Sequence, residues 1–94
     1  MTDLASVREL VLFADNNYKL YQVKKTYWTN ALNKVRKGTF DPKKAPKLFQ
    51  YFADRASAEY KKEYGYAFPV AVRVAASKEF AAEFIEMVKS GEIS

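Results

Sequence analysis

The chain contains no cysteine and no histidine. Without cysteine it cannot form a disulfide bond, a thiolate metal site or a cysteine nucleophile. Without histidine it lacks the commonest general base near neutral pH, and its serines have no imidazole to activate them. The loss of both residue types leaves carboxylate sites for hard cations as the only metal option. We expect no catalytic residue, no metal site and no cofactor, and we interpret the chain as a binding protein rather than an enzyme.

Glycine and long hydrophobic runs are also scarce. Three glycines do not provide a glycine-rich phosphate loop. No apolar run approaches the ~20 residues that a membrane-spanning helix needs. The first residues, MTDLASVRELVLFADNN, are acidic and amphipathic, unlike the basic and then apolar start of a signal segment. We expect no membrane association and a location in the cytoplasm, which for a viral protein is the host cytoplasm.

Hydrophobic residues are plentiful, at 49% of the chain, and aromatic residues reach 16%. This composition is typical of a chain with a packed core and differs from that of disordered proteins. A chain of 94 residues is long enough for one core and too short for two. We therefore predict a single helical domain over residues 1–94.

Apolar residues recur at helical spacing in four segments, at about 4–14, 18–37, 45–64 and 69–89. Short connections between such segments favour antiparallel neighbours. The sequence therefore predicts an all-α fold, a small antiparallel bundle of three to four helices. Between the first two segments the pattern leaves two alternatives: one bent helix over 4–37, or two helices separated at Asn16 and Asn17.

Several residues predict where the helices begin and end. Gly38 is expected in the left-handed conformation that stops a helix, and Gly65 is expected to end the helix over about 45–64. Asp41 followed by Pro42 is typical of a helix start, because the aspartate side chain accepts hydrogen bonds from free backbone N–H groups. Pro46 would remove a hydrogen bond inside a helix. We expect an irregular turn before the regular helix begins at about residue 45.

One residue in the segment 18–37 breaks the division between an apolar and a polar side. Lys24 falls near the middle of the apolar arc when residues are placed at 100° steps. Either its ammonium group reaches past its aromatic neighbours to solvent, or a polar group or partner meets it there.

Positive charge is concentrated in residues 19–47. This stretch holds nine lysines and arginines against one acid, Asp41, and so carries +8, whereas the whole chain carries +5. Localised positive charge affects the choice of partner and the encounter rate rather than the fold. The residues that we predict to bind an anion or a partner are Lys43, Lys44, Lys47, Lys34, Arg36 and Lys37.

These six cations divide by their place on the predicted helices. The cations of residues 34–37 lie at the end of one helix, where they complement the helix dipole and need no ligand. Lys43, Lys44 and Lys47 lie at the start of the next helix, where the dipole favours anions. Free N–H groups near Asp41 would add to the attraction for a phosphate or carboxylate. These cations have three alternative interpretations: a solvated lysine face, a nucleic-acid site, and a site for an acidic protein surface or for self-association.

Two further features have both a structural and a functional interpretation. Glu79, Glu83 and Glu86 form one row on the last predicted helix. This row either pairs with cations, within the chain or in a second copy, or binds a hard cation, and it lacks loop-borne oxygen ligands. The stretch 48–68 is rich in tyrosine and phenylalanine, which either form the core with hydroxyl groups at its rim or make an exposed patch that anchors a partner.

About half of the chain resembles a known group of proteins. The block of about residues 18–65 contains NYKLY and then YWTNALNKVRKGTFDPKKAPKLFQYFADRASAEYKKEYG. It resembles small uncharacterised helical proteins of tailed phages and of mobile or metagenomic sequences. In these, a helix with paired aromatics leads through a KGTFDP-like corner into an LFxYFAxxAxxxYxKEYG-like helix. Pro46 stands where that pattern has an aliphatic residue. The resemblance implies a viral accessory protein and supplies no mechanism.

Together these features predict a small non-enzymatic protein-interaction module that binds a protein partner or self-associates. The alternative is a non-specific nucleic-acid-binding accessory protein that uses the basic surface of residues 19–47. Lysines attract phosphates without reading base edges, so such binding would depend strongly on salt and not on sequence.

Overall fold

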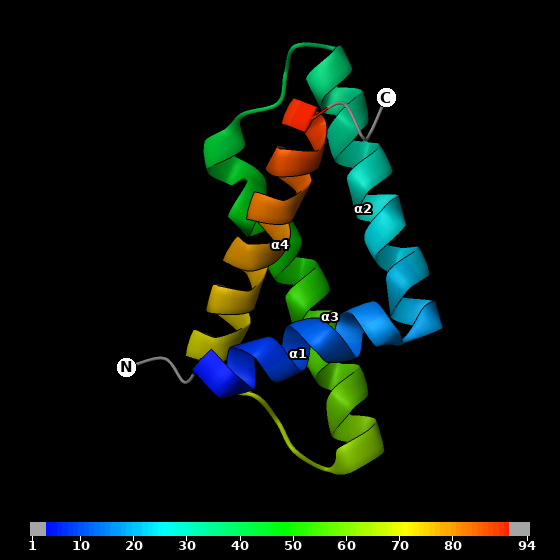
Figure 1. The fold of residues 1–94 in the computed structure, drawn as a ribbon, viewed down its shortest axis with the longest axis vertical. Helices are drawn as coiled ribbons and strands as arrows, with labels where there is room; N and C mark the ends of the chain where they lie inside the picture. The colour runs from blue at the N-terminus through cyan, green and yellow to red at the C-terminus, as the bar shows by residue number, and fades with distance from the viewer. Residues whose placement is uncertain (1–3, 91–94) are drawn as a thin grey trace.

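The computed structural model describes residues 4–90 (Figure 1). This part of the chain forms four α-helices and one short 3₁₀ helix, and it contains no strand. The elements are α1 (Leu4–Asn16), α2 (Tyr18–Arg36), η1 (Pro42–Lys44), α3 (Ala45–Tyr64) and α4 (Val70–Ser90). None of these helices has the length and hydrophobicity to cross a membrane. The predicted all-α fold is confirmed.

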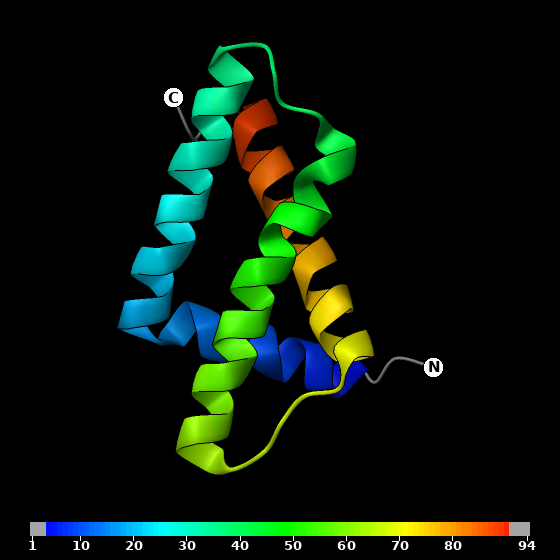
Figure 2. The ribbon, with the colours of Figure 1, turned by 180° about the vertical axis from the view of Figure 1, so that it is seen from behind.

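Three of these helices form an antiparallel bundle, and α1 crosses it (Figures 1 and 2). α2 and α4 run in one direction, and α3, which packs beside α4, runs in the other. α1 lies across them and contacts α2, α3 and α4. The prediction of a small antiparallel bundle of three to four helices is therefore confirmed, with α1 as the crossing member.

The chain changes direction between α1 and α2 at Asn17. The backbone of this residue is extended, with φ −93° and ψ 114°, and its Oδ1 accepts a hydrogen bond from the Leu20 N–H at 3.1 Å. This N-cap begins a new helix whose axis turns away from that of α1 (Figure 1). The alternative of two helices is therefore correct, and one helix over 4–37 is excluded.

The connection between α2 and α3 follows the predicted local signals. Gly38 after α2 has a φ of 72°, and Gly65 after α3 has a φ of 75°, the left-handed region that residues with side chains rarely enter. Asp41 Oδ1 accepts a hydrogen bond from the Lys43 N–H at 3.0 Å and so caps η1 rather than α3. η1 is the predicted irregular turn. It leaves Pro46 in the first turn of α3, where a missing N–H costs little.

Phenylalanines of α3 and α4 form the centre of the core. Phe49, Phe52, Phe80 and Phe84 are each almost fully buried. The ring centroids of Phe52 and Phe80 lie 5.0 Å apart and the rings meet at 70°. Such an edge-to-face pair contributes ~0.5 to 1.5 kcal/mol beyond its buried area. The Tyr27 ring of α2 lies 5.9 Å from that of Phe52, and Leu20 and Ala31 of α2 are also buried in the core.

Polar side chains also join α3 to α4. Arg73 Nη1 of α4 lies 2.9 Å from Asp54 Oδ1 of α3, and Gln50 Nε2 donates to the same carboxylate oxygen at 3.0 Å. Arg73 Nε donates to the Phe68 carbonyl, in the connection between the two helices, at 3.3 Å. The Arg73–Asp54 pair therefore links α4 to α3, while Gln50 within α3 and the Phe68 carbonyl hold its two side chains in place.

Lys24 lies inside the protein, with 2% of its side chain exposed. Its Nζ lies 2.5 Å from Asp15 Oδ1 of α1 and 3.4 Å from Glu83 Oε1 of α4. The Trp28 ring centroid is 4.8 Å from the same nitrogen and adds a cation–π contact. Of the two alternatives for this lysine, the one in which a polar group meets it is therefore correct. Lys24 links α2 to both α1 and α4.

The two carboxylates that pair with Lys24 keep part of their contact with water. The side chains of Asp15 and Glu83 are 35% and 39% exposed. The lysine alone is therefore fully desolvated, and two acids compensate for a cost that reaches several kcal/mol when a buried charge is unpaired.

Removing the Lys24 side chain should destabilise the fold. Lys24→Ala deletes the ammonium group and leaves a void beside Trp28 and Phe80. We expect the free energy of unfolding to fall by about 2 to 4 kcal/mol, as measured by urea denaturation followed by circular dichroism. Lys24→Met keeps most of the packed aliphatic stem, so we expect a smaller fall in the free energy of unfolding. That smaller fall measures the contribution of the ion pairs.

Lys25→Ala is the matched control, because Lys25 is the exposed neighbour on the same helix. Its free energy of unfolding should change by no more than about 0.5 kcal/mol. A Lys24→Ala protein as stable as Lys25→Ala would show that the buried pair does not hold the helices together.

Candidate functional site

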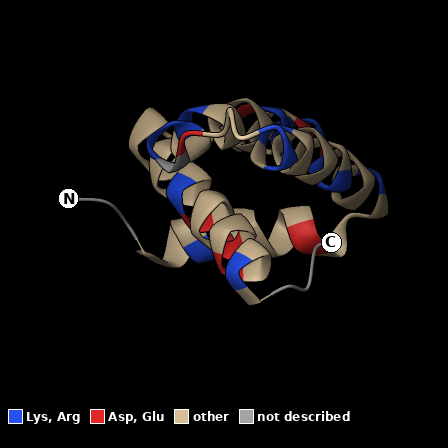
Figure 3. Ribbon diagram, turned by 90° about the horizontal axis from the view of Figure 1, so that it is seen from above, with Lys and Arg blue, Asp and Glu red and all other residues tan. Residues whose placement is uncertain are grey.

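The six cations predicted as the site are all exposed. Those of residues 34–37 lie at the end of α2, Lys43 and Lys44 lie in η1, and Lys47 lies in the first turn of α3. Seen from above, lysines and arginines follow α2 and continue around the corner into η1 and α3 (Figure 3). The structure therefore brings the six residues together at one end of the bundle.

The exposed cations of residues 19–47 are not neutralised by acids. The ion pairs among the described residues involve only Lys24, Lys62 and Arg73 as cations. In addition, α2 contains no aspartate or glutamate. The unpaired cations of this stretch are Lys19, Lys25, Lys34, Arg36, Lys37, Lys43, Lys44 and Lys47.

Two hollows lie between α2 and α3 on this cationic side. The corner hollow has a volume of about 300 Å³ and is lined by Lys34, Thr39, Phe40, Asp41, Lys44 and Leu48. The middle hollow, further along the two helices, has a volume of about 390 Å³ and is lined by Val23, Thr26, Tyr27, Asn30 and Arg55. Each hollow is therefore bordered by at least one cation together with polar side chains.

We define the α2–α3 face as these two hollows together with one row of side chains along each helix beside them. The first row, with one turn between its members on α2, consists of Thr26, Asn30 and Lys34. The second row covers an arc of about 100° of the α3 side, at 100° per residue, and consists of Lys44, Lys47, Leu48, Tyr51 and Arg55. Because α2 and α3 run side by side in opposite directions (Figure 2), both rows border the same surface.

Free backbone N–H groups near Asp41 are predicted to help attract a phosphate or carboxylate. For two of these groups the prediction is wrong. The Lys43 N–H donates to the Asp41 side chain at 3.0 Å, and the Lys44 N–H donates to the Asp41 carbonyl at 2.9 Å. The 3₁₀ turn satisfies these donors locally, because it brings Asp41 within hydrogen-bond distance of both. Any attraction of these two residues for an anion comes from their side-chain ammonium groups.

Tyr51 and Arg55 lie outside the six predicted cations, and the charge pattern of residues 19–47 does not point to them. The signal that could have found them is spacing, because Lys47, Tyr51 and Arg55 are four residues apart and share one side of α3. Tyr51 is 64% exposed, whereas its phenylalanine neighbours are buried. In the aromatic stretch 48–68 the phenylalanines therefore lie in the core, whereas Tyr51, Tyr64 and Tyr66 are exposed. That exposed rings anchor a partner stays a prediction.

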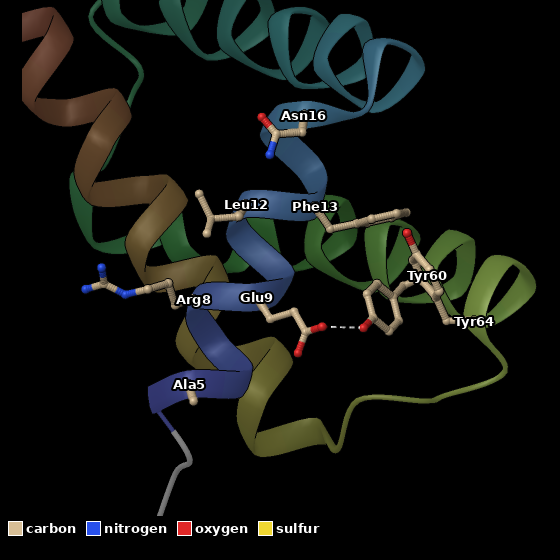
Figure 4. Close-up of a pocket in the computed structure, with 8 residues that line it drawn as sticks. All are labelled: Ala5, Arg8, Glu9, Leu12, Phe13, Asn16, Tyr60 and Tyr64. Atoms are coloured by element: carbon tan, nitrogen blue, oxygen red, sulfur yellow. Dashed lines mark hydrogen bonds between the residues drawn. The ribbon is translucent and has the colours of Figure 1, made fainter.

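A larger hollow lies over α1 and the end of α3 (Figure 4). It has a volume of about 740 Å³ and is lined by Ala5, Arg8, Glu9, Leu12, Phe13, Asn16, Tyr60 and Tyr64. Figure 4 shows Arg8 and Leu12 on the side of α1 opposite Tyr60 and Tyr64. The lining groups therefore do not converge on one point, as they do in a small-molecule pocket.

One hydrogen bond joins α1 to α3 in this hollow. Tyr60 donates its hydroxyl to Glu9 Oε1 at 2.5 Å (Figure 4). This bond to a carboxylate is the largest cause of the raised pKa of Tyr60, which is about 12. The ring centroids of Phe13 and Tyr64 lie 5.0 and 4.7 Å from that of Tyr60. The rings contact one another and leave no space for a ligand between them, so we assign this cluster a structural role.

The acidic residues of α4 do not gather into a metal site. Within residues 4–90, no group of three or more acidic side chains is placed to hold a metal ion. Glu83 pairs with Lys24, whereas Glu79 lines a separate hollow together with Arg8. Of the alternatives for this acidic row, pairing within the chain is therefore correct for Glu83.

No family model, curated protein or solved structure matches the chain. The resemblance of about residues 18–65 to phage proteins therefore stays a prediction. Function is inferred from the contacts, charges and exposure of the described residues.

The Glu9 carboxylate should control the ionisation of Tyr60. In Glu9→Gln a neutral amide replaces the charged acceptor, so the pKa of Tyr60 should fall from about 12 toward its ordinary value of ~10. Because the folded pKa is the raised one, this bond stabilises the folded state fully below ~pH 10, and the contribution is lost as the pH rises toward about 12. Alkaline absorbance titrations measure this pKa. The titration of the parent protein and that of Glu9→Gln are each compared with the same protein carrying Tyr60→Phe, and the difference reports Tyr60. An unchanged value in Glu9→Gln would show that another group causes the shift.

Proposed function

We propose that this chain is a small non-enzymatic binding module that holds nucleic acid on its α2–α3 face through contacts to phosphate groups. The observation that carries the proposal is that the exposed cations of residues 19–47 have no acidic partner, and that Lys34, Lys44 and Arg55 line the two hollows of this face. Among the described residues, Asp41 is the only acid that lines either hollow. Charges of one sign repel one another in the free protein, and a bound polyanion removes this repulsion.

The fold does not require the lysines at the corner. Lys43, Lys44 and Lys47 lie around the start of α3, where the helix dipole favours acids over cations. No acid occupies the first turn of α3. The electrostatics of the helix alone therefore disfavour this arrangement, and a negatively charged ligand gives it a physical reason.

The residue types of the surface suit phosphate groups better than bases. Seven of the eight exposed cations are lysines, which bind phosphate as flexible point charges without reading a base edge. Asn30 of the α2 row can donate hydrogen bonds to phosphate and sugar oxygens, whereas the Thr26 hydroxyl donates to the Gln22 carbonyl at 3.3 Å. We therefore expect binding that depends strongly on salt and little on sequence.

An acidic protein surface is the competing ligand, which corresponds to the predicted protein partner or self-association. Glu79 and Glu86 of a second copy are exposed carboxylates of this kind. The uncharged Asn30 amide of the α2 row favours nucleic acid, because oxygen acceptors line the whole sugar–phosphate backbone.

Fluorescence anisotropy with labelled single strands and duplexes tests the proposal. We expect a dissociation constant below ~10⁻⁴ M at low salt and a salt dependence that corresponds to ~4 to 6 phosphate contacts. Unlabelled polyglutamate should compete poorly. Weaker binding at low salt would contradict the proposal, and equal competition by polyglutamate would favour an acidic protein surface instead.

Charge reversal should show where the phosphates bind. Lys44→Glu combined with Lys47→Glu puts acids where the helix dipole favours them, so circular dichroism should show an intact fold. We expect the affinity to fall at least ~10-fold and the salt slope to decrease by ~1 to 2. Lys61→Glu combined with Lys78→Glu is the matched control, since both residues are exposed and lie outside the α2–α3 face. An equal loss of affinity in both proteins would show that net charge alone attracts nucleic acid.

A further inference from the structure

We infer that the nucleic acid on the α2–α3 face is single-stranded and that one of its bases stacks on the ring of Tyr51. The inference rests on the proposed function and names the class of its ligand. Tyr51 lies in the middle of the α3 row, between Leu48 of the corner hollow and Arg55 of the middle hollow. A base on this ring would therefore lie between the two hollows.

The Tyr51 side chain has no partner among the described residues. Its ring is 64% exposed, and within residues 4–90 it takes part in no ring contact and its hydroxyl makes no hydrogen bond. The other exposed tyrosines of residues 48–68 pack against neighbouring rings. Tyr64 packs on Tyr60 with ring centroids 4.7 Å apart. Tyr66 packs on Phe68 at 5.1 Å. The face of the Tyr51 ring is therefore free for a ligand.

Cations lie one turn to either side of this ring. Lys47 precedes Tyr51 by four residues and Arg55 follows it by four, so the three side chains share one side of α3. The row from Lys44 to Arg55 is ~16 Å long at 1.5 Å per residue. The backbone of a strand can therefore contact cations before and after the nucleotide whose base covers the ring.

A ring in this position distinguishes a single strand from a duplex. In a duplex the bases are paired and stacked on each other, so a side chain on a rigid helix reaches only groove edges and phosphates. In a single strand the base faces are accessible, and stacking on an aromatic ring tolerates every sequence because each base has a π-face. The cations attract both forms, but Tyr51 adds affinity only for the single strand.

Anisotropy titrations of the full chain with a labelled oligothymidylate of ~12 nucleotides test this inference. Tyr51→Ala should weaken binding of this strand ~5- to 100-fold, while the salt slope and the affinity for a duplex stay unchanged. Tyr51→Phe keeps the ring and should bind like the parent protein. Circular dichroism should show unchanged helicity in both, because the side chain is exposed.

Tyr18→Ala is the matched control for the loss of an exposed tyrosine. Tyr18 is 79% exposed at the start of α2 and lines neither hollow. Its removal should leave the affinity for the single strand unchanged. A loss equal to that of Tyr51→Ala would overturn the assignment of stacking to Tyr51.

A strand with abasic sites throughout separates stacking from phosphate contacts. It keeps the phosphates and lacks the bases, so the parent protein should bind it as weakly as Tyr51→Ala binds the normal strand. If Tyr51→Ala binds the normal strand as tightly as the parent while the salt dependence persists, the stacking inference is wrong and phosphate binding stands. If the parent protein binds neither strand nor duplex, the proposed function itself is wrong.

Discussion

The burial of Lys24 is the constraint on which the position of α2 depends. Its ammonium group lies against Trp28 and pairs with Asp15 of α1 and Glu83 of α4. Because an unpaired charge at this depth would cost several kcal/mol, the three helices have to meet at this point. α2 also buries Leu20 and Ala31 in the core, and Tyr27 contacts Phe49 and Phe52. The buried lysine and these apolar residues together determine which side of α2 faces inward and which side faces solvent.

With Lys24 directed inward, the outer side of α2 carries cations and no acid. Exposed helices commonly carry both signs, so that residues one turn apart neutralise each other. Such pairing cannot occur within α2, and the corner adds further lysines beside an exposed tyrosine ring. The hollow over α1 differs, because its aromatic rings pack on one another and Glu9 accepts the Tyr60 hydroxyl. For these reasons we propose the α2–α3 face, and not this hollow, as the binding surface.

Local signals in the sequence predict most of the fold, and contacts between distant residues account for the rest. Gly38, Gly65 and Asp41 act on their immediate neighbours, so the ends of the helices could be predicted. The crossing direction of α1 could not, because it follows from packing against three other helices. Lys24 is recognisable as an exception on an apolar arc, but its partners lie 9 and 59 residues away. Spacing places Arg55 on the same side of α3 as Lys47, but its position beside α2 follows from the packing of the two helices.

Buried and exposed lysines of this chain respond differently to dissolved salt. Mobile ions screen exposed charges over ~8 Å at physiological ionic strength, whereas a buried pair is screened much less. The lysines of the corner are in full contact with these ions, and Lys24 is sheltered from them by the three helices that surround it. A rise in ionic strength is therefore expected to weaken the proposed binding at the surface and to leave the fold intact, although both involve lysine ammonium groups.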